Sequence, residues 1–413
     1  MPATIDAGAA VQPITPPLDP GPVFLAGFSA NRRATAVHDD LCARALALRI
    51  APDARPAATF VLVACDLIGL LRADISAIEA AARAAAQERG LDLGTLVVAC
   101  THTHSGPDTL GLWGPSRVRS GVNPNYQAWL RAQIAGTAVE AVAALQPARL
   151  RVGRGEMVAW LKNARQPEIA DRELSVLQAT ADDREPIFTL VNLACHPEVL
   201  WNDNTALSAD YAGAACRAVE AQAGGTTVFS SADLGGMMTP DVPAHSFEVV
   251  EQMGADVART ALAALRAGED LAPDALSVRQ REVHIPLQNP IFKFALVTRV
   301  LPGLNRDKDG RVVTRVSLVD LGALRLVTVP GELLPGPGMA LREMLGVPHR
   351  FLIGLADDEL GYLLPSDVYA YPRNPFRPGG HYEETMSLSR YATPLLMEAW
   401  AALLRDSEGD PHD

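Results

Sequence analysis

Short apolar runs alternate along the chain with longer alanine-rich segments, and this alternation constrains the fold more than any other feature of the sequence. The apolar runs are rich in β-branched residues and have the length of buried strands; they lie at 60–65, 95–100, 187–195, 226–230, 324–329 and 350–355. The alanine-rich segments have the composition and spacing of amphipathic helices; they lie at about 73–88, 125–145, 209–222, 247–267 and 391–405. The alternation predicts an α/β fold with a mixed β-sheet flanked by helices.

The length of the chain and the absence of a clear linker favour a single domain. The 413 residues suffice for one large core, and the sequence shows no internal repeat and no convincing linker. The stretch at 272–316 is poorly patterned, which predicts an insertion or lid there. We therefore expect one domain over 1–405 and a polar tail at 406–413.

The charge balance argues against several classes of partner. The chain has 36 Lys and Arg against 48 Asp and Glu, a formal net charge of -12, which disfavours nucleic acid and anionic membrane surfaces. No stretch approaches the ~18 apolar residues of a spanning helix. The first residues lack the basic and apolar regions of a secretory signal. We expect a cytoplasmic protein without stable membrane insertion that binds a small molecule, and the sequence leaves a homo-oligomer open.

Histidines directly follow two of the predicted buried strands. His102 and His104 lie two residues apart in THTHSGPDT, so both side chains project to one side if the segment is extended. His196 follows the run at 187–195. Neutral imidazole is a common zinc ligand, and three histidines at strand ends can converge on one ion. A lone histidine in such a place is more often structural, so the pattern leaves a metal site and a structural role about equally open.

Carboxylates follow two further predicted strands. Glu332 lies in a Pro-Gly turn after the run at 324–329, and Asp357, Asp358 and Glu359 follow the run at 350–355. One such carboxylate would complete a His/His/Glu zinc sphere and leave a position open for water. Spacing alone favours the simpler alternative, a solvated glutamate in a turn.

A series of motifs, taken in order, resembles those of the neutral/alkaline (non-lysosomal) ceramidase family. The motifs are THTHSGP at 101–107, NLACHP at 192–197, SADYAG at 208–213, SSADLGGMMTPD at 230–241, VPGELL at 329–334, GYLLP at 361–365 and HYEE at 381–384. The resemblance spans nearly the whole chain, and THTHSGP and ACHP are its most specific elements. It implies the N-terminal catalytic domain of that family, in which one zinc ion hydrolyses an amide bond.

The resemblance also implies a set of site residues. The zinc ligands it implies are two histidines, a glutamate and a tyrosine, at His102, His196, Glu332 and Tyr362. It places His104 beside the substrate oxygen, where the imidazole stabilises the transition state, and it makes Arg165 and Tyr382 further catalytic candidates. The chain departs from the family pattern around both, since Ala164 separates Arg165 from the preceding Asn163 and extra residues at 369–376 precede Tyr382.

These features predict a zinc-dependent hydrolase that cleaves the amide bond of an N-acyl amine, ceramidase-like and acting in lipid metabolism. Zn²⁺ lowers the pKa of a bound water toward ~7, so water attacks without a covalent intermediate. The chain has no GxSxG elbow, which disfavours a serine hydrolase. We expect no C-terminal immunoglobulin-like domain. The alternatives are a zinc-dependent esterase or other small-amide hydrolase and, from a different class, a non-hydrolytic zinc-bound binding protein.

Overall fold

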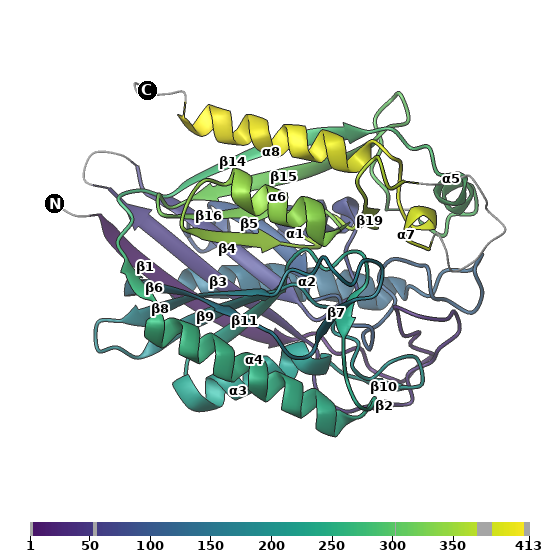
Figure 1. Ribbon diagram of the computed structural model, residues 1–413, viewed down its shortest axis with the longest axis horizontal. Helices are drawn as coiled ribbons and strands as arrows, with labels where there is room; N and C mark the ends of the chain where they lie inside the picture. Colours follow the sequence, from purple (N-terminus) through teal and green to yellow (C-terminus); the bar gives the residue numbers. More distant parts are fainter. Residues whose placement is uncertain (1–2, 53–55, 302, 370–381, 409–413) are drawn as a thin grey trace.

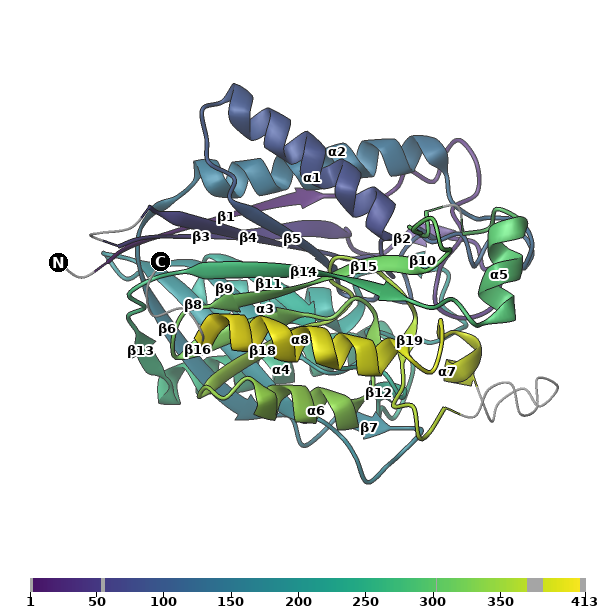
Figure 2. The same cartoon turned by 90° about the horizontal axis from the view of Figure 1, so that it is seen from above.

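The protein folds into four stacked layers of helices and sheets. The structure is a computed structural model that describes residues 3–52, 56–301, 303–369 and 382–408. Two layers of helices lie outside, and a large and a small β-sheet pack face to face between them (Figures 1 and 2). Among the described residues, no helix is both long and apolar enough to cross a bilayer.

The large sheet has nine strands and mixed pairing. Eight follow one another in the spatial order β11 (Thr226–Ser231), β9 (Pro186–Leu193), β8 (Glu173–Ala181), β6 (Gln146–Glu156), β1 (Thr4–Pro13), β3 (Cys42–Ala51), β4 (Ala58–Cys65) and β5 (Thr95–Cys100), and β13 (Glu269–Leu271) pairs with β6. The pairs β11–β9 and β4–β5 are parallel, whereas the pairs between them are antiparallel.

Four helices cover the outer face of this sheet; they are α1 (Arg72–Glu88), α2 (Pro124–Ala143), α3 (Asp210–Ala223) and α4 (Phe247–Ala267). Side chains cap two of them, because Asn123 accepts hydrogen bonds from backbone amides in the first turn of α2 and Ser246 does the same for α4. Their apolar faces bury residues such as Ile78 and Leu130 against the sheet.

The small sheet packs against the inner face of the large one. Its strands lie in the order β14 (Ser277–Ile285), β15 (Val312–Asp320), β16 (Leu324–Thr328) and β18 (His349–Ile353). Phe351 and Leu326 join Phe60 and Leu190 of the large sheet in one buried cluster. Helices α6 (Pro335–Met344) and α8 (Ala392–Glu408) cover its outer face, where Trp400 Nε1 donates to the carbonyl of Thr328 at 3.1 Å.

The predicted α/β architecture, a mixed sheet flanked by helices, is confirmed. The apolar runs correspond to β4, β5, β9, β11, β16 and β18, and the alanine-rich segments correspond to α1, α2, α3, α4 and α8. The stretch 272–316 contains β14, helix α5 (Pro290–Val297) and the start of β15. Of the predicted tail, residues 406–408 continue α8, and 409–413 lie outside the described residues. The remaining elements are short: β2 (Ala36–Val37), β7 (Leu161–Asn163), β10 (Ala206–Leu207), β12 (Met238–Pro240), β17 (Glu332–Leu333), β19 (Tyr362–Leu363) and α7 (Tyr382–Thr385).

The large sheet curves so strongly that its two end strands meet. β11 contacts both β4 and β5. Ser231 Oγ, at the end of β11, donates to the carbonyl of Thr101 just after β5, at 2.7 Å. The amide of Gly354, just after β18, donates to the carbonyl of Ser231 at 2.8 Å. The carboxyl ends of strands from both sheets therefore gather at one place.

Candidate metal centre

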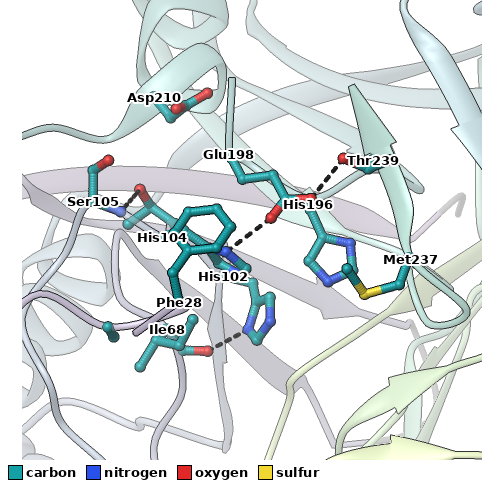
Figure 3. Close-up of polar contacts among 12 residues, drawn as sticks. Phe28, Ile68, His102, His104, Ser105, His196, Glu198, Asp210, Met237 and Thr239 are labelled. Atoms are coloured by element: carbon teal, nitrogen blue, oxygen red, sulfur yellow. Dashed lines mark hydrogen bonds and ion pairs between the residues drawn. The ribbon is translucent and has the colours of Figure 1, made fainter. Parts of the chain in front are cut away.

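Three buried histidines meet where these strands end. His102 and His104 follow β5, and His196 follows β9. The centroid of the His102 ring lies 5.1 Å from that of His104 and 5.1 Å from that of His196, and the His104 and His196 centroids are 5.4 Å apart. One ligand atom from each ring lies within 4.8 Å of the others, a spacing that suits one metal ion (Figure 3).

The segment that carries two of these histidines is not extended. β5 ends at Cys100, and His102 has a φ of 68°, in the left-handed region that side chains other than glycine rarely adopt. The amide of His102 donates to the carbonyl of Leu67 at 2.9 Å, which fixes this turn. Both imidazoles reach the cluster through a turn rather than through the alternation of an extended chain.

Backbone carbonyls fix the protonation of two of the rings. His102 Nδ1 lies 2.5 Å from the carbonyl oxygen of Ile68, and His196 Nδ1 lies 2.8 Å from that of Met238. A carbonyl oxygen only accepts, so each Nδ1 carries the proton and donates it. At His102 the Nε2 then has a free lone pair, which is the form in which histidine binds a metal. At His196 the Nε2 faces the Glu332 carboxylate, so metal binding would displace the proton between them, while the carbonyl of Met238 still holds the ring.

Glu332 completes this donor set. β17 and β19 pair in parallel with Glu332 opposite Tyr362, so the fold places the predicted carboxylate and phenol ligands side by side. Glu332 Oε2 lies 3.0 Å from His196 Nε2, and Glu332 Oε1 lies 3.6 Å from His102 Nε2. Tyr362 is buried, with its hydroxyl 3.4 Å from the sulfur of Met237.

The two histidines that face Glu332 differ in their pKa values. Burial lowers the pKa of His102 to about 3. Burial also opposes charge on His196, but the hydrogen bond to Glu332 and nearby carboxylates outweigh it and raise the pKa of His196 to about 9. Burial favours the neutral form of Glu332, yet the three neighbouring side chains outweigh it and lower its pKa. A metal ion would replace the proton between His196 and Glu332, and two imidazole nitrogens with a carboxylate oxygen are donors that fit Zn²⁺.

Glu198, which sequence reasoning missed, supports the third histidine. Its Oε2 lies 2.9 Å from His104 Nδ1, and Thr239 Oγ1 donates to its Oε1 at 2.6 Å (Figure 3). The Glu198 side chain is fully buried, which favours its neutral form, but its interactions with His104, His196 and Thr239 outweigh burial and lower the pKa of Glu198 to about 2. The only available signal was its place two residues after His196.

A cavity of about 470 Å³ opens over the cluster. Its polar lining includes His102, His104, Glu198, Glu332 and Glu359. Most of the wall is apolar and comes from separate parts of the chain, with Phe28, Ile68, Leu71, Leu110, Leu112, Trp113, Trp201, Phe292, Leu301 and Leu304. A polar floor beneath apolar walls suits an amphiphilic molecule whose polar group reaches the histidines.

The remaining predicted residues divide into two groups. Tyr382 lines the cavity, and its ring centroid lies 5.9 Å from that of Tyr362. Arg165 is not part of the lining among the described residues; its Nη1 lies 2.8 Å from Glu383 and its Nη2 lies 2.8 Å from Glu384. Both glutamates belong to α7, so Arg165 holds the short helix that begins with Tyr382.

No family model matches the sequence, and no curated protein matches it. Solved structures are similar. The neutral ceramidase from Pseudomonas aeruginosa matches with a TM-score of 0.76 and 20% identity over 100% of this chain and 76% of that one. A ceramidase complexed with C2 matches with a TM-score of 0.78 and 18% identity over 99% of this chain and 76% of that one. The resemblance predicted from the motifs is thereby confirmed at the level of structure, and the chain has the neutral-ceramidase fold over its whole length.

Proposed function

We propose that this protein is a zinc-dependent hydrolase that cleaves the amide bond of an N-acyl amine. The observation that carries the proposal is the convergence of His102, His196 and Glu332 beside a largely apolar cavity that His102 and Glu332 line. The two similar structures are ceramidases, enzymes of N-acyl amines, which supports an amide as the bond that is cleaved.

In this proposal His102, His196 and Glu332 hold the ion, and Tyr362 lies beside Glu332 as the fourth ligand. A bound zinc ion supplies hydroxide at neutral pH by lowering the pKa of water toward ~7. The carbonyls of Ile68 and Met238 keep both imidazoles in the metal-binding tautomer.

His104 acts on the substrate carbonyl. The Glu198 carboxylate only accepts, so Nδ1 of His104 carries a proton toward it, and the other ring nitrogen donates to the carbonyl oxygen when the imidazole is protonated. One such positioned donor is typically worth ~3 kcal/mol in the transition state. The proton lost by the attacking water can protonate His104, Glu198 stabilises that protonated imidazole, and His104 then hands the proton to the leaving amine.

Tyr382 supplies a second donor at the same cavity. Burial, together with nearby carboxylates, raises the pKa of Tyr382 to about 12, so its hydroxyl stays protonated at neutral pH and can donate. Arg165 contributes by holding α7 through its two glutamate partners. The apolar wall, which includes Leu71, Phe292 and Leu301, binds the acyl chain and excludes water from the reacting bond.

The three-histidine cluster offers a second arrangement of the same centre. His104 would replace Glu332 as third ligand, with Glu198 as the outer carboxylate behind the ring. The metal content of His104→Ala distinguishes the two arrangements, because only the second one loses the ion.

The test combines metal analysis with a substrate panel. We expect about one zinc ion per chain, as a site of three or four such ligands requires. The protein should hydrolyse N-acyl amines faster than matched esters, lose activity with a chelator and regain it with zinc. Zinc without hydrolysis of any amide or ester would contradict the proposal and favour a non-hydrolytic zinc-bound binding protein. Faster cleavage of the esters would favour the esterase.

A further inference from the structure

Helix α5 exposes large apolar side chains to solvent. Ile291, Phe294 and Val297 are 45%, 56% and 82% exposed, whereas Phe292 and Ala295 of the same helix are buried. A spacing of three residues places the exposed side chains along one side of the helix. We call these three residues the apolar stripe. Single exposed apolar residues are ordinary, but a contiguous row of them marks an interaction surface.

The stripe lies at the rim of the cavity. Phe292, on the buried side of α5, lines the cavity together with Leu301 and Leu304, which follow the helix. Figures 1 and 2 show α5 beside α7 at the end of the molecule opposite the N-terminus.

A loop at 110–121 reaches the same rim. Leu112 and Trp113 line the cavity from this loop. A Cβ on Gly111 would lie 2.3 Å from the carbonyl oxygen of Val300, so the loop packs directly on the segment after α5. At its far side the loop exposes Val118, which is 52% exposed. Loop and helix therefore form one continuous surface.

This surface is locally cationic although the chain as a whole is acidic. The exposed side chains Arg117, Arg119, Lys293 and Arg299 belong to the same two segments as the apolar ones, and the segments 110–121 and 286–301 contain no acidic residue. The full chain carries a formal net charge of -12. A hollow beside α5 has both apolar and cationic side chains in its lining, which consists of Leu287, Lys293, Leu296, Val297, Arg306 and Gly310; the exposed Asp309 precedes Gly310.

We propose that α5 and the loop 110–121 dock the protein on an anionic lipid surface, with the cavity rim facing the lipid. Apolar side chains bury at the boundary of headgroups and acyl chains while Lys and Arg contact anionic headgroups, and the two contributions add. A two-fold dimer through this surface would place its Lys and Arg side chains against those of the second copy, whereas an anionic bilayer neutralises them, so the charge favours the bilayer. The purpose of this docking rests on the proposed function: long-chain N-acyl amines reside in bilayers, so a docked enzyme reaches its substrate there.

Vesicle binding tests the proposal without catalysis. The protein is sedimented with vesicles of phosphatidylcholine alone and of phosphatidylcholine with phosphatidylserine, and we expect salt-sensitive binding only to the second. The double variant Phe294→Ser/Val297→Ser should bind at least ~10-fold more weakly, since two apolar side chains are lost. Val158→Ser is the matched control, because Val158 is 71% exposed on the turn between β6 and β7 and should bind like the parent.

A second pair of variants tests how much the positive charges contribute to vesicle binding. Arg117→Gln/Lys293→Gln should weaken binding to the phosphatidylserine vesicles by about 30-fold, from two cations near the surface. Arg259→Gln, an exposed arginine of α4, should change little.

Three results would overturn the docking proposal. The first is that the protein is not enriched on the phosphatidylserine vesicles, and the second is that the Phe294→Ser/Val297→Ser variant binds them as strongly as the parent. The third is a dimer in analytical ultracentrifugation that this variant dissociates, which would make a second copy the partner. A short, water-soluble N-acyl amine should be cleaved equally by parent and variant. If the parent cleaves no N-acyl amine, the proposed function fails, while the vesicle measurements still decide the docking.

Discussion

Replacing Glu198 with glutamine is the sharpest test of how the site works. The substitution keeps the shape of the side chain but removes the charge that faces His104 Nδ1 at 2.9 Å. Glu198 is not among the proposed metal ligands, so the ion should stay. The variant therefore separates the role of the His104–Glu198 pair from metal binding.

The structure sets the magnitude of this effect. The pKa of Glu198 is lowered from 4.5 to about 2, chiefly by His104 acting against burial. A shift of that size corresponds to ~3 kcal/mol in favour of the charged carboxylate. The neutral amide of the Glu198→Gln variant cannot stabilise the protonated His104 imidazole in this way. If His104 donates to the developing oxyanion, kcat should fall by ~100-fold while KM changes little.

The assay compares kcat, KM and zinc content of parent and Glu198→Gln with one soluble N-acyl amine. Thr239→Val is the graded control, because it removes a hydrogen bond of 2.6 Å to Glu198 but leaves its charge, and we expect a loss of about fivefold. A kcat for Glu198→Gln within about threefold of the parent, with zinc retained, would refute the role of the pair, since that is far below the effect of one oxyanion donor.

His196→Ala should abolish both metal binding and activity, and stoichiometric zinc in a His102→Ala/His196→Ala variant would show that the ion binds elsewhere. Tyr362→Phe should lower zinc affinity or turnover and leave the fold intact by circular dichroism; parental zinc affinity and rate would make Tyr362 a wall residue. His104→Ala should lower kcat by roughly 10²–10³ and keep its zinc, whereas loss of zinc would make His104 a ligand. Glu198 has a folded pKa depressed from 4.5 to about 2, so its stabilising contribution is present above pH 4.5 and is lost as the pH falls through 2. Acid titration of unfolding should thus be shallower in this range for Glu198→Gln than for the parent.

The strands that sequence analysis found and missed differ in one physical respect. The detected runs, such as β4 and β5, are buried on both faces and therefore form continuous apolar stretches. β3 carries Arg44 and Arg49 among its apolar residues, and Arg44 pairs with Glu220 of α3. β6 carries three arginines and exposes several of its side chains. A criterion based on apolar runs cannot detect strands whose charged residues face helices or solvent.

The composition of the site was more predictable than its assembly. His102, His104 and His196 were accessible because polar residues after buried strands lie at the edge where α/β sheets place ligands. The sequence could not predict that the ends of β5 and β9 meet. The two strands lie near opposite ends of the strand order, and only the curvature of the sheet brings them together. The same holds for Glu332 and Tyr362, whose pairing depends on the register of β17 with β19.

The backbone at His102 is strained, and contacts within the folded chain hold it in place. His102, Trp201 and Met237 line the cavity with φ values of 68°, 60° and 59°, in a region that costs a non-glycine residue roughly 1–2 kcal/mol. At His102 the cost is offset by two hydrogen bonds, from its amide to Leu67 and from its Nδ1 to Ile68. Glycine would relieve the strain but would remove the imidazole. The turn therefore depends on contacts already made by the folded chain, which orient the histidine before any ion binds.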